Sequence, residues 1–195
     1  MQERSLKTRA DILVAASECF ARNGYDATGV AEICAAAGVS KGAFYHHFKT
    51  KQALFLALLE NWLLGIDTYL EDRRLEAASI PEALRQISGL MSLVFAQAGG
   101  RLPMFLEFWT QAGHDPVIWQ AVIQPYQRYQ VYFSNLVRSG IAEGSLKPVE
   151  PETTARALVS LALGALLQGL LYPEDTDWGN AAQESIELFL TGIEK

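Results

Sequence analysis

Three histidines and the residues beside them are the first places to look for catalysis or metal binding in this chain. His46 and His47 are adjacent, and adjacent side chains on a helix point about 100° apart, so their imidazoles cannot share one metal ion. His114 and Asp115 would suggest a general-base pair, but no nucleophile or glycine-rich phosphate loop accompanies them. Asp115 before Pro116 is better explained as a helix N-cap. The sequence therefore predicts no catalytic residue, no metal site and no cofactor.

A different chemistry is indicated in residues 28–54, where small, hydroxyl and basic side chains surround two short predicted helices. Gly38 ends the first helix where a left-handed cap is needed, and Ser40 can cap the second. Phe44 and Phe48 lie one helical turn apart and are expected to face inward. Gly42, Ala43, Tyr45, His46 and Lys49 are then left facing outward. A short helix with small residues at its start and outward Tyr, His and Lys suits the major groove of DNA.

The outward side chains suit particular parts of a DNA duplex. Hydroxyl, imidazole and ammonium groups bind phosphate oxygens, small residues allow close approach, and longer polar side chains reach base edges. We predict phosphate contacts from Thr28, Ser40, His47 and Lys51, close approach at Gly42, a thymine-methyl contact from Ala43, base-edge contacts from Tyr45 and His46, and either role for Lys41. Few of these residues read bases bidentately, so dimer spacing and DNA deformability are expected to add specificity.

The segment AGVSKGAFYHHFKTKQAL, residues 37–54, resembles the DNA-binding signature of the TetR family of bacterial transcriptional regulators. The matching positions are Thr28, Ile33, Ala37, Gly38, Val39, Ser40, Gly42, Tyr45, Phe48, Lys51 and Leu54. The resemblance covers residues 5 to about 55, with Gly29 in place of a small hydroxyl residue and Cys34 in place of a common alanine. It implies a helix-turn-helix domain in residues 1–50 and double-stranded operator DNA as a partner.

Charge is distributed as a DNA-binding N-terminal part would require. The net charge of −6 argues against nucleic acid as a partner for the whole surface. Residues 1–60, however, carry seven Lys and Arg against six acids, whereas residues 61–195 carry nine against sixteen. The N-terminal part is expected to face DNA while the rest repels phosphate.

The other composition signals indicate a cytoplasmic protein with a large core. Half of the 195 residues are hydrophobic, and the polar N-terminus lacks the pattern of a signal peptide. Cys19 and Cys34 fall on apolar helix faces and are expected to be buried thiols, with a redox sensor as the less favoured interpretation.

The whole chain is predicted to be all-α, with about nine helices and no strands. The expected helices cover residues 5–23, the two short helices above, 51–76 after the cap Thr50, a fifth from Pro81 to Gly99, 103–112, 116 to about 140 with Pro125 inside, 152–172, and a last one from about Trp178. A membrane span is the competing interpretation of residues 152–172, but the unbroken apolar run is shorter than the about 20 residues required and contains Gln168. We therefore expect no membrane partner.

In the family that the chain resembles, the helices after the DNA-binding domain bind an effector and form a homodimer, which implies both roles for residues 51–195. The candidate ligand-binding residues are Trp62, Met91, Phe95, Phe105, Glu107, Phe108, Trp109, His114, Trp119, Tyr126, Tyr129 and Gln168. The candidate dimer residues are Leu161, Gly164, Ala165, Gln168, Ile186 and Phe189. Glu107 would favour a cationic lipophilic ligand if it faced a cavity, whereas a surface position is its ordinary interpretation.

Two functions fit these features, and no feature supports an enzyme. The favoured one is a homodimeric repressor whose small lipophilic effector tilts the helix 51–76 and changes the spacing of the two recognition helices. The alternative is an effector-independent DNA-binding dimer that acts through a protein partner or as an architectural factor. In the alternative, the aromatic residues at 103–133 form solid core rather than a cavity.

Overall fold

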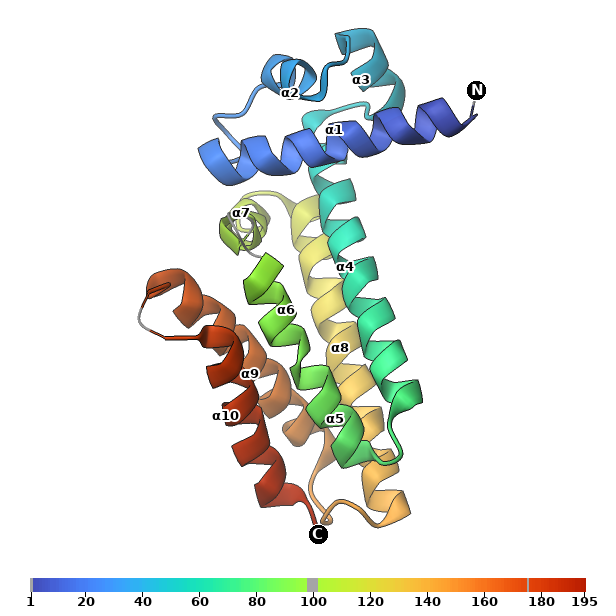
Figure 1. The fold of residues 1–195 in the computed structure, drawn as a ribbon, viewed down its shortest axis with the longest axis vertical. Coiled ribbons are helices and arrows are strands. Elements are labelled where there is room, and N and C mark those ends of the chain that lie inside the picture. Colours follow the sequence, from blue (N-terminus) through green and yellow to red (C-terminus); the bar gives the residue numbers. More distant parts are fainter. Residues whose placement is uncertain (1, 98–101, 175) are drawn as a thin grey trace. The chain divides into compact units, whose positions relative to one another are not determined.

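The computed structural model describes residues 2–97, 102–174 and 176–195, with the side chains of residues 2, 3, 97 and 102–105 excepted. Within these residues the chain is all-helical, which confirms the predicted fold class (Figure 1). The described helices are α1 Gln2–Asn23, α2 Val30–Ala37, α3 Lys41–His47, α4 Lys51–Glu76, α5 Ile80–Ser88, α6 Leu90–Gln97, α7 Leu102–Ala112, α8 Pro116–Glu143, α9 Pro151–Leu171 and α10 Trp178–Ile193.

Two of the long helices begin at the caps that the sequence predicts. The Thr50 hydroxyl accepts a hydrogen bond from the Ala53 amide at 2.9 Å, and α4 starts at the next residue. The Asp115 carboxylate accepts from the amides of Val117 and Ile118, at 2.7 and 3.2 Å, at the start of α8. Side chains that satisfy the free amides of a first turn fix where a helix begins.

The fifth predicted helix is divided at Gly89 into α5 and α6, which corrects the expectation of one continuous helix. The reason is a close approach by α4. The Tyr69 hydroxyl donates to the Gln86 carbonyl at 3.1 Å, and a Cβ at position 89 would lie 2.9 Å from that hydroxyl. Gly89 makes room for this contact, and the Gln86 carbonyl also accepts from the Gly89 amide.

The chain packs as two compact units, one made of Met1–Leu64 and Gly99–Val122 and the other of Gly65–Ala98 and Ile123–Lys195. We call them unit 1 and unit 2. The helix-turn-helix domain predicted for residues 1–50 lies in unit 1, which also contains residues from α4, α7 and α8. The two units are defined by how the chain packs. The boundary predicted at residue 50 instead separates a DNA-binding function from effector binding and dimerisation, and that boundary stays a prediction.

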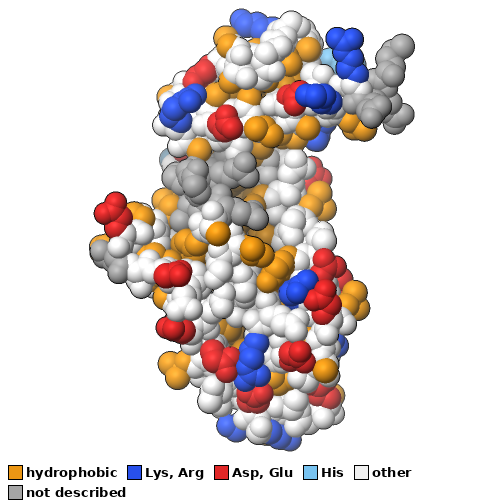
Figure 2. All heavy atoms as spheres, in the orientation of Figure 1, with side chains coloured by type: hydrophobic (Ala, Val, Ile, Leu, Met, Phe, Trp, Pro, Cys, Tyr) orange, Lys and Arg blue, Asp and Glu red, His pale blue; other side chains and the backbone are white. Residues whose placement is uncertain are grey.

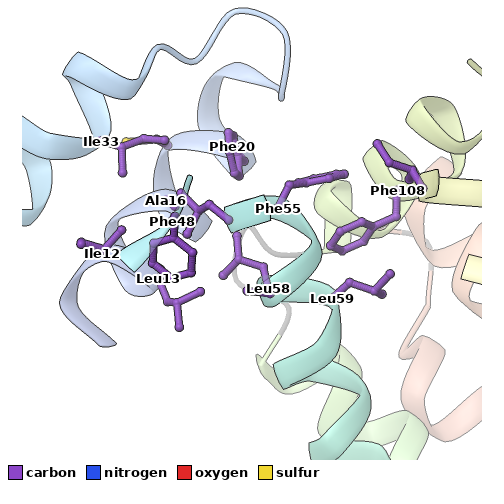
Figure 3. Close-up of a cluster of buried hydrophobic side chains, with 14 of the residues drawn as sticks. Ile12, Leu13, Ala16, Phe20, Ile33, Phe48, Phe55, Leu58, Leu59 and Phe108 are labelled. Carbon is purple, nitrogen blue, oxygen red and sulfur yellow. The ribbon is translucent and has the colours of Figure 1, made fainter. Parts of the chain in front are cut away.

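Unit 1 is built around α1, which packs against α2, α3 and α7. An aromatic group at its core surrounds the fully buried Phe55 of α4, whose ring lies 5.6 Å from Phe20, 4.5 Å from Tyr25 and 4.3 Å from Phe108 between centroids. Figure 3 shows Phe55 and Phe108 pointing toward each other beside the aliphatic side chains of the same cluster. Helices α1, α2 and α3 therefore share one core with α4 and α7.

Two polar groups also join the helices of unit 1. The Gln52 amide of α4 donates to the Asp115 carboxylate at 2.7 Å. The Gln111 amide of α7 donates to Asp26, in the turn after α1, at 3.2 Å and to Glu107 at 3.1 Å. Glu107 therefore has a partner within unit 1.

Unit 2 is centred on α10, which packs against α5, α6 and α9. Its core is aliphatic, and Leu190 and Leu146 are fully buried in it. The Asp67 carboxylate of α4 accepts hydrogen bonds from Arg128, at 2.8 and 3.0 Å, and from the Tyr129 hydroxyl at 3.0 Å. Burial, with the hydrogen bond to Asp67, raises the pKa of Tyr129 to about 12, so its hydroxyl remains a donor across the physiological range.

Two of the described helices, α4 and α9, are long and apolar enough to cross a membrane by length and composition alone. Core helices of soluble proteins meet the same criterion, so this observation is weak evidence for a membrane protein.

Candidate nucleic-acid interface

The turn between α2 and α3 has the geometry that its sequence predicts. Gly38 adopts a left-handed conformation, with φ of 66°, and its amide and that of Val39 bond to carbonyls at the end of α2. The Ser40 hydroxyl then accepts from the Ala43 amide at 3.1 Å and caps α3. A left-handed glycine followed by a serine cap lets two helices meet in a tight turn.

Helix α3 packs on the core of unit 1 through two phenylalanines, and its opposite face is exposed. Phe44 and Phe48 are buried in the core of unit 1, as predicted. Tyr45 between them is 46% exposed, and its ring packs edge-on against Phe44 at 5.2 Å. The tyrosine is thus supported at its base and presents the rest of the ring to solvent, which suits a side chain that reads base edges.

The small and polar residues at the start of α3 are also exposed. Lys41, Gly42 and His46 are exposed, while Ala43 and His47 are half-buried. A Cβ at position 42 would meet only the Ser40 hydroxyl, at 3.7 Å, so glycine is not required there by the protein's own packing. Close approach of DNA is the remaining reason for glycine at this position, and it stays a prediction.

A basic residue from α1, Arg9, lies against the Phe48 ring under α3. The Arg9 guanidinium lies 5.2 Å from the centre of the Phe48 ring, next to His47. Partial burial, followed by the nearby charges of His46 and Arg9, lowers the pKa of His47. The basic residues at the start of the first helix were the sequence signal for Arg9, because cations in that position can contact a phosphate backbone.

Thr28 does not lie on the exposed surface, so the predicted phosphate contact from its hydroxyl is wrong. The side chain is fully buried, and its hydroxyl is shared between the carbonyl oxygens of Gly24, at 2.7 Å, and Cys19, at 3.2 Å. It ties the turn after α1 to the end of that helix. Gly29 is the N-cap of α2, and no side chain caps that end.

Lys51 is half-buried, and its ammonium has acceptors within the protein. It donates to the carbonyl oxygens of Tyr25 at 2.7 Å and Thr28 at 3.0 Å, and it reaches that of Asp26 at 3.5 Å. The ammonium also lies 4.2 Å from the centre of the Tyr25 ring. This geometry does not support the phosphate contact predicted for its side chain.

The candidate effector residues fall into both units. In unit 1, Phe108 is buried against Phe55, and His114 and Trp119 are exposed; the side chain of Phe105 lies outside the described residues. Trp62 is half-buried against the core, and Trp109 is at the surface with interactions of its own. Phe108 therefore belongs to the core of unit 1, and its role toward an effector stays a prediction.

In unit 2, the candidate effector residues lie on three helices. Met91 is buried and Phe95 is half-buried on α6, and the Phe95 ring would be 2.3 Å from a Cβ at Gly169 of α9. The Tyr126 hydroxyl accepts from Gln130 of the same helix, α8, at 2.9 Å. Gln168 is exposed and donates weakly to a carbonyl of its own helix, α9. Their role toward an effector stays a prediction.

The candidate dimer residues divide between the core and the surface of unit 2. Ala165 and Ile186 are buried within one chain, whereas Leu161 and Phe189 are half-buried against the core. A Cβ at Gly164 would meet no atom within 4 Å, so this position is open. Leu167 and Leu171 of α9 and Leu188 of α10 are exposed and were not among the candidate dimer residues.

The charge distribution agrees with DNA contact through unit 1 alone. Figure 2 shows many Asp and Glu side chains over unit 2, with some Lys and Arg side chains among them, on the face that it draws. Acidic side chains repel the phosphate backbone, so they disfavour DNA on this part of the surface.

Both parts of the sequence match known families. Residues 12–58 match the model of bacterial regulatory proteins of the tetR family. Residues 82–192, more than half of the chain, match the model of the C-terminal part of BetI-type transcriptional repressors. The two matches cover the DNA-binding helices and most of unit 2.

Known proteins that resemble the chain over nearly its whole length are regulators of the same kind. The HTH-type transcriptional regulator YfiR of Bacillus subtilis is 27% identical over 200 residues, which cover 98% of this chain and 94% of the relative. The regulator FadR of Bacillus subtilis, solved in complex with stearoyl-CoA, has a TM-score of 0.82 and 22% identity, covering 95% of this chain and 99% of its own.

A regulator from Saccharomonospora viridis, solved in complex with choline, has a TM-score of 0.81 and 20% identity over 96% of this chain and 97% of its own. The two solved structures share the fold of this chain, and the family models cover its sequence. The chain therefore belongs to the TetR family of bacterial transcriptional regulators, with a C-terminal part of the BetI type, and is a DNA-binding regulator of transcription.

Proposed function

We propose that the protein is a homodimeric repressor that leaves its operator when a small lipophilic effector binds. The observation that carries the proposal is the outward face of α3, where Tyr45 is exposed between two buried phenylalanines beside Gly42 and His46. Two such helices on a dimer enter successive major grooves when they are about 34–36 Å apart. A ligand that binds a conformation with another spacing lowers the affinity for DNA.

The exposed leucines of unit 2 support a dimer. Leu167 and Leu171 of α9 are a helical turn apart, and Gly164 on the same side of the helix is open to close approach. Leu188 of α10, which packs against α9, is 78% exposed. Exposed apolar side chains on two packed helices favour an interaction surface, and a second copy of the same pair would make a four-helix interface.

The fold alone does not determine which chemical class of effector binds. One regulator of this fold was solved with choline and another with stearoyl-CoA, a small cation and a long acyl thioester. Glu107, the candidate for recognising a cation, has a hydrogen-bond partner in Gln111. We therefore propose an uncharged lipophilic effector contacted by the half-buried aromatic residues Phe95 and Tyr126.

The burial of Phe108 favours the second function, a DNA-binding dimer without a small-molecule effector. Phe108 packs in the core of unit 1, and Met91 is buried in unit 2, so both have a packing role that needs no ligand. Native mass spectrometry of protein purified from cells distinguishes the two functions. A bound small molecule whose removal strengthens DNA binding supports the repressor. If the protein releases its DNA fully and no small molecule is bound to it, the second function is supported.

No group of side chains in the described residues supports an enzyme, and we propose a purely regulatory protein of the cytoplasm. The described histidines, cysteines and acidic residues form no group that could hold a metal ion. Turnover of any substrate by the purified protein would contradict this proposal.

Replacing Tyr45 with alanine is expected to weaken binding to the DNA upstream of the protein's own gene by about 10- to 100-fold, the effect of one lost base contact. The fold should survive, because nearly half of this side chain is exposed. Mobility shifts at low salt measure the change. The control is Trp119→Ala, an exposed aromatic residue of α8 that should leave the affinity unchanged. Equal affinities of Tyr45→Ala and wild type would count against the proposed surface.

The affinity for DNA is expected to rise as the pH falls, because His47 should take up a proton beside a phosphate. Its pKa is lowered in the free protein by partial burial, His46 and Arg9, so the residue is neutral at pH 7 before binding. A neighbouring phosphate raises the pKa of His47. Each pKa unit between the free and the DNA-bound protein changes the affinity by up to about tenfold as the pH passes from one pKa to the other. Fluorescence anisotropy between pH 5.5 and 8 measures it, and His47→Gln should flatten the curve.

A further inference from the structure

The ammonium of Lys51 lies between two elements of unit 1 that are far apart in the sequence. Lys51 is the first residue of α4, and its acceptors are the carbonyl oxygens of Tyr25, Asp26 and Thr28 in the turn between α1 and α2. The two shorter contacts are 2.7 and 3.0 Å, and the third is 3.5 Å. An ammonium has three donors and no acceptor, so these carbonyls account for its hydrogen-bonding capacity.

The position is favourable for a cation for two further reasons. The turn follows the C-terminus of α1, where unpaired carbonyl groups give a helix its negative end. The Tyr25 ring, 4.2 Å from the ammonium, adds attraction through its face. Within unit 1 this ring also packs against Phe55 of α4, so the same tyrosine holds both the lysine and the aromatic core.

The turn that Lys51 holds sets the start of α2. Thr28, whose carbonyl accepts from Lys51, is followed by the N-cap Gly29, and its buried hydroxyl bonds back to Gly24 and Cys19. Helix α2 in turn packs against α1 and α3. A displacement of Lys51, the first residue of α4, would therefore also displace α2, the helix before the recognition helix α3.

We propose that Lys51 is a positioning residue, which fixes the turn between α1 and α2 and thereby orients α2 and α3 for DNA, and that it makes no phosphate contact of its own. The inference rests on the proposed DNA surface of α3 and is independent of any effector.

The test compares two substitutions that separate charge from geometry. Lys51→Met removes the charge, whereas Lys51→Arg keeps it but offers a planar fork that cannot direct three donors to these carbonyls. Binding to a short random-sequence duplex is measured as a function of salt, at a temperature where circular dichroism shows each variant to be folded. Lys49→Met, an exposed lysine two residues away, is the matched control for loss of charge.

Both Lys51 variants are expected to bind the duplex about tenfold more weakly than wild type, because charge-assisted hydrogen bonds are lost in each. The slope of log affinity against log salt should stay unchanged. Loss of a phosphate contact would instead reduce the slope by about 0.9 per chain. If Lys51→Met does not fold, Lys51→Arg carries the comparison.

Two results would overturn the inference. In the first, the slope of log affinity against log salt is reduced in Lys51→Met and is the same as wild type in Lys51→Arg, which shows that Lys51 contacts a phosphate. In the second, both variants melt earlier but bind the duplex like wild type, which leaves only a structural role. Wild-type protein that binds random and upstream DNA equally would count against the proposed repressor, and the comparison of the Lys51 variants would still decide this inference.

Discussion

Replacing Leu188 with aspartate is expected to separate the dimer and to reduce operator binding by about 100-fold or more, because a monomer loses the avidity of two linked half-site contacts. Leu188 is 78% exposed on α10, so the substitution removes little packing within one chain. A carboxylate buried between two copies without a partner is costly, and each dimer would contain two of them.

Sedimentation equilibrium and mobility shifts measure the two parts of this prediction. The matched control is Val131→Asp, because Val131 of α8 is another exposed apolar residue of unit 2, at 60%, and should leave the dimer intact. Circular dichroism should show the same helix content for wild type and both variants. A Leu188→Asp variant that remains dimeric would place the interface elsewhere, and a monomer with full operator affinity would contradict the homodimeric mechanism.

Helix boundaries were the most predictable part of the fold, because they depend on neighbouring residues. Thr50 and Asp115 cap α4 and α8 through their own side chains, and Gly38 and Ser40 form the turn before α3. Each of these features is local to a few residues. The break at Gly89 was missed because its cause is Tyr69, which lies twenty positions earlier in the chain.

The candidate site was predictable where exposure follows from helical spacing and was mispredicted where it depends on tertiary contacts. Burial of Phe44 and Phe48 placed Tyr45 outward, as the spacing requires. Thr28 and Lys51 have the chemistry of phosphate ligands, but backbone carbonyls of unit 1 accept their hydrogen bonds. Cys19 accepts from Thr28, and Tyr25 accepts from Lys51.

The faces of α9 show a second limit of sequence patterns. Because this helix is apolar nearly all round, its periodicity does not tell the core side from the exposed side. Ala165 proved to be buried within the chain, whereas Leu167 is exposed. Which residues meet a partner depends on how α10 packs against α9, and that contact is set by the tertiary structure.

Replacing Phe55 with alanine is expected to cost about 3–5 kcal/mol of the free energy of unfolding of unit 1, the usual effect of removing a fully buried aromatic ring. The ring contacts Phe20 of α1, Tyr25 of the following turn and Phe108 of α7, so its loss leaves a cavity among three elements (Figure 3). Single domains of this size have about 5–15 kcal/mol in total, so DNA binding at 37 °C should also be lost or nearly so.

Urea unfolding followed by tryptophan fluorescence measures this loss, because Trp62, Trp109 and Trp119 all belong to unit 1. Phe55→Leu is the graded control: it fills part of the cavity and should lower the free energy of unfolding by less than half as much. Phe189→Ala, at a half-buried phenylalanine of unit 2, should leave the unfolding of unit 1 unchanged. If Phe55→Ala unfolded like wild type, the DNA-binding helices would not depend on the aromatic core that α4 and α7 share with them. In that case the hydrogen bonds from Lys51 to the turn between α1 and α2 would be what connects α4 with the DNA-binding helices.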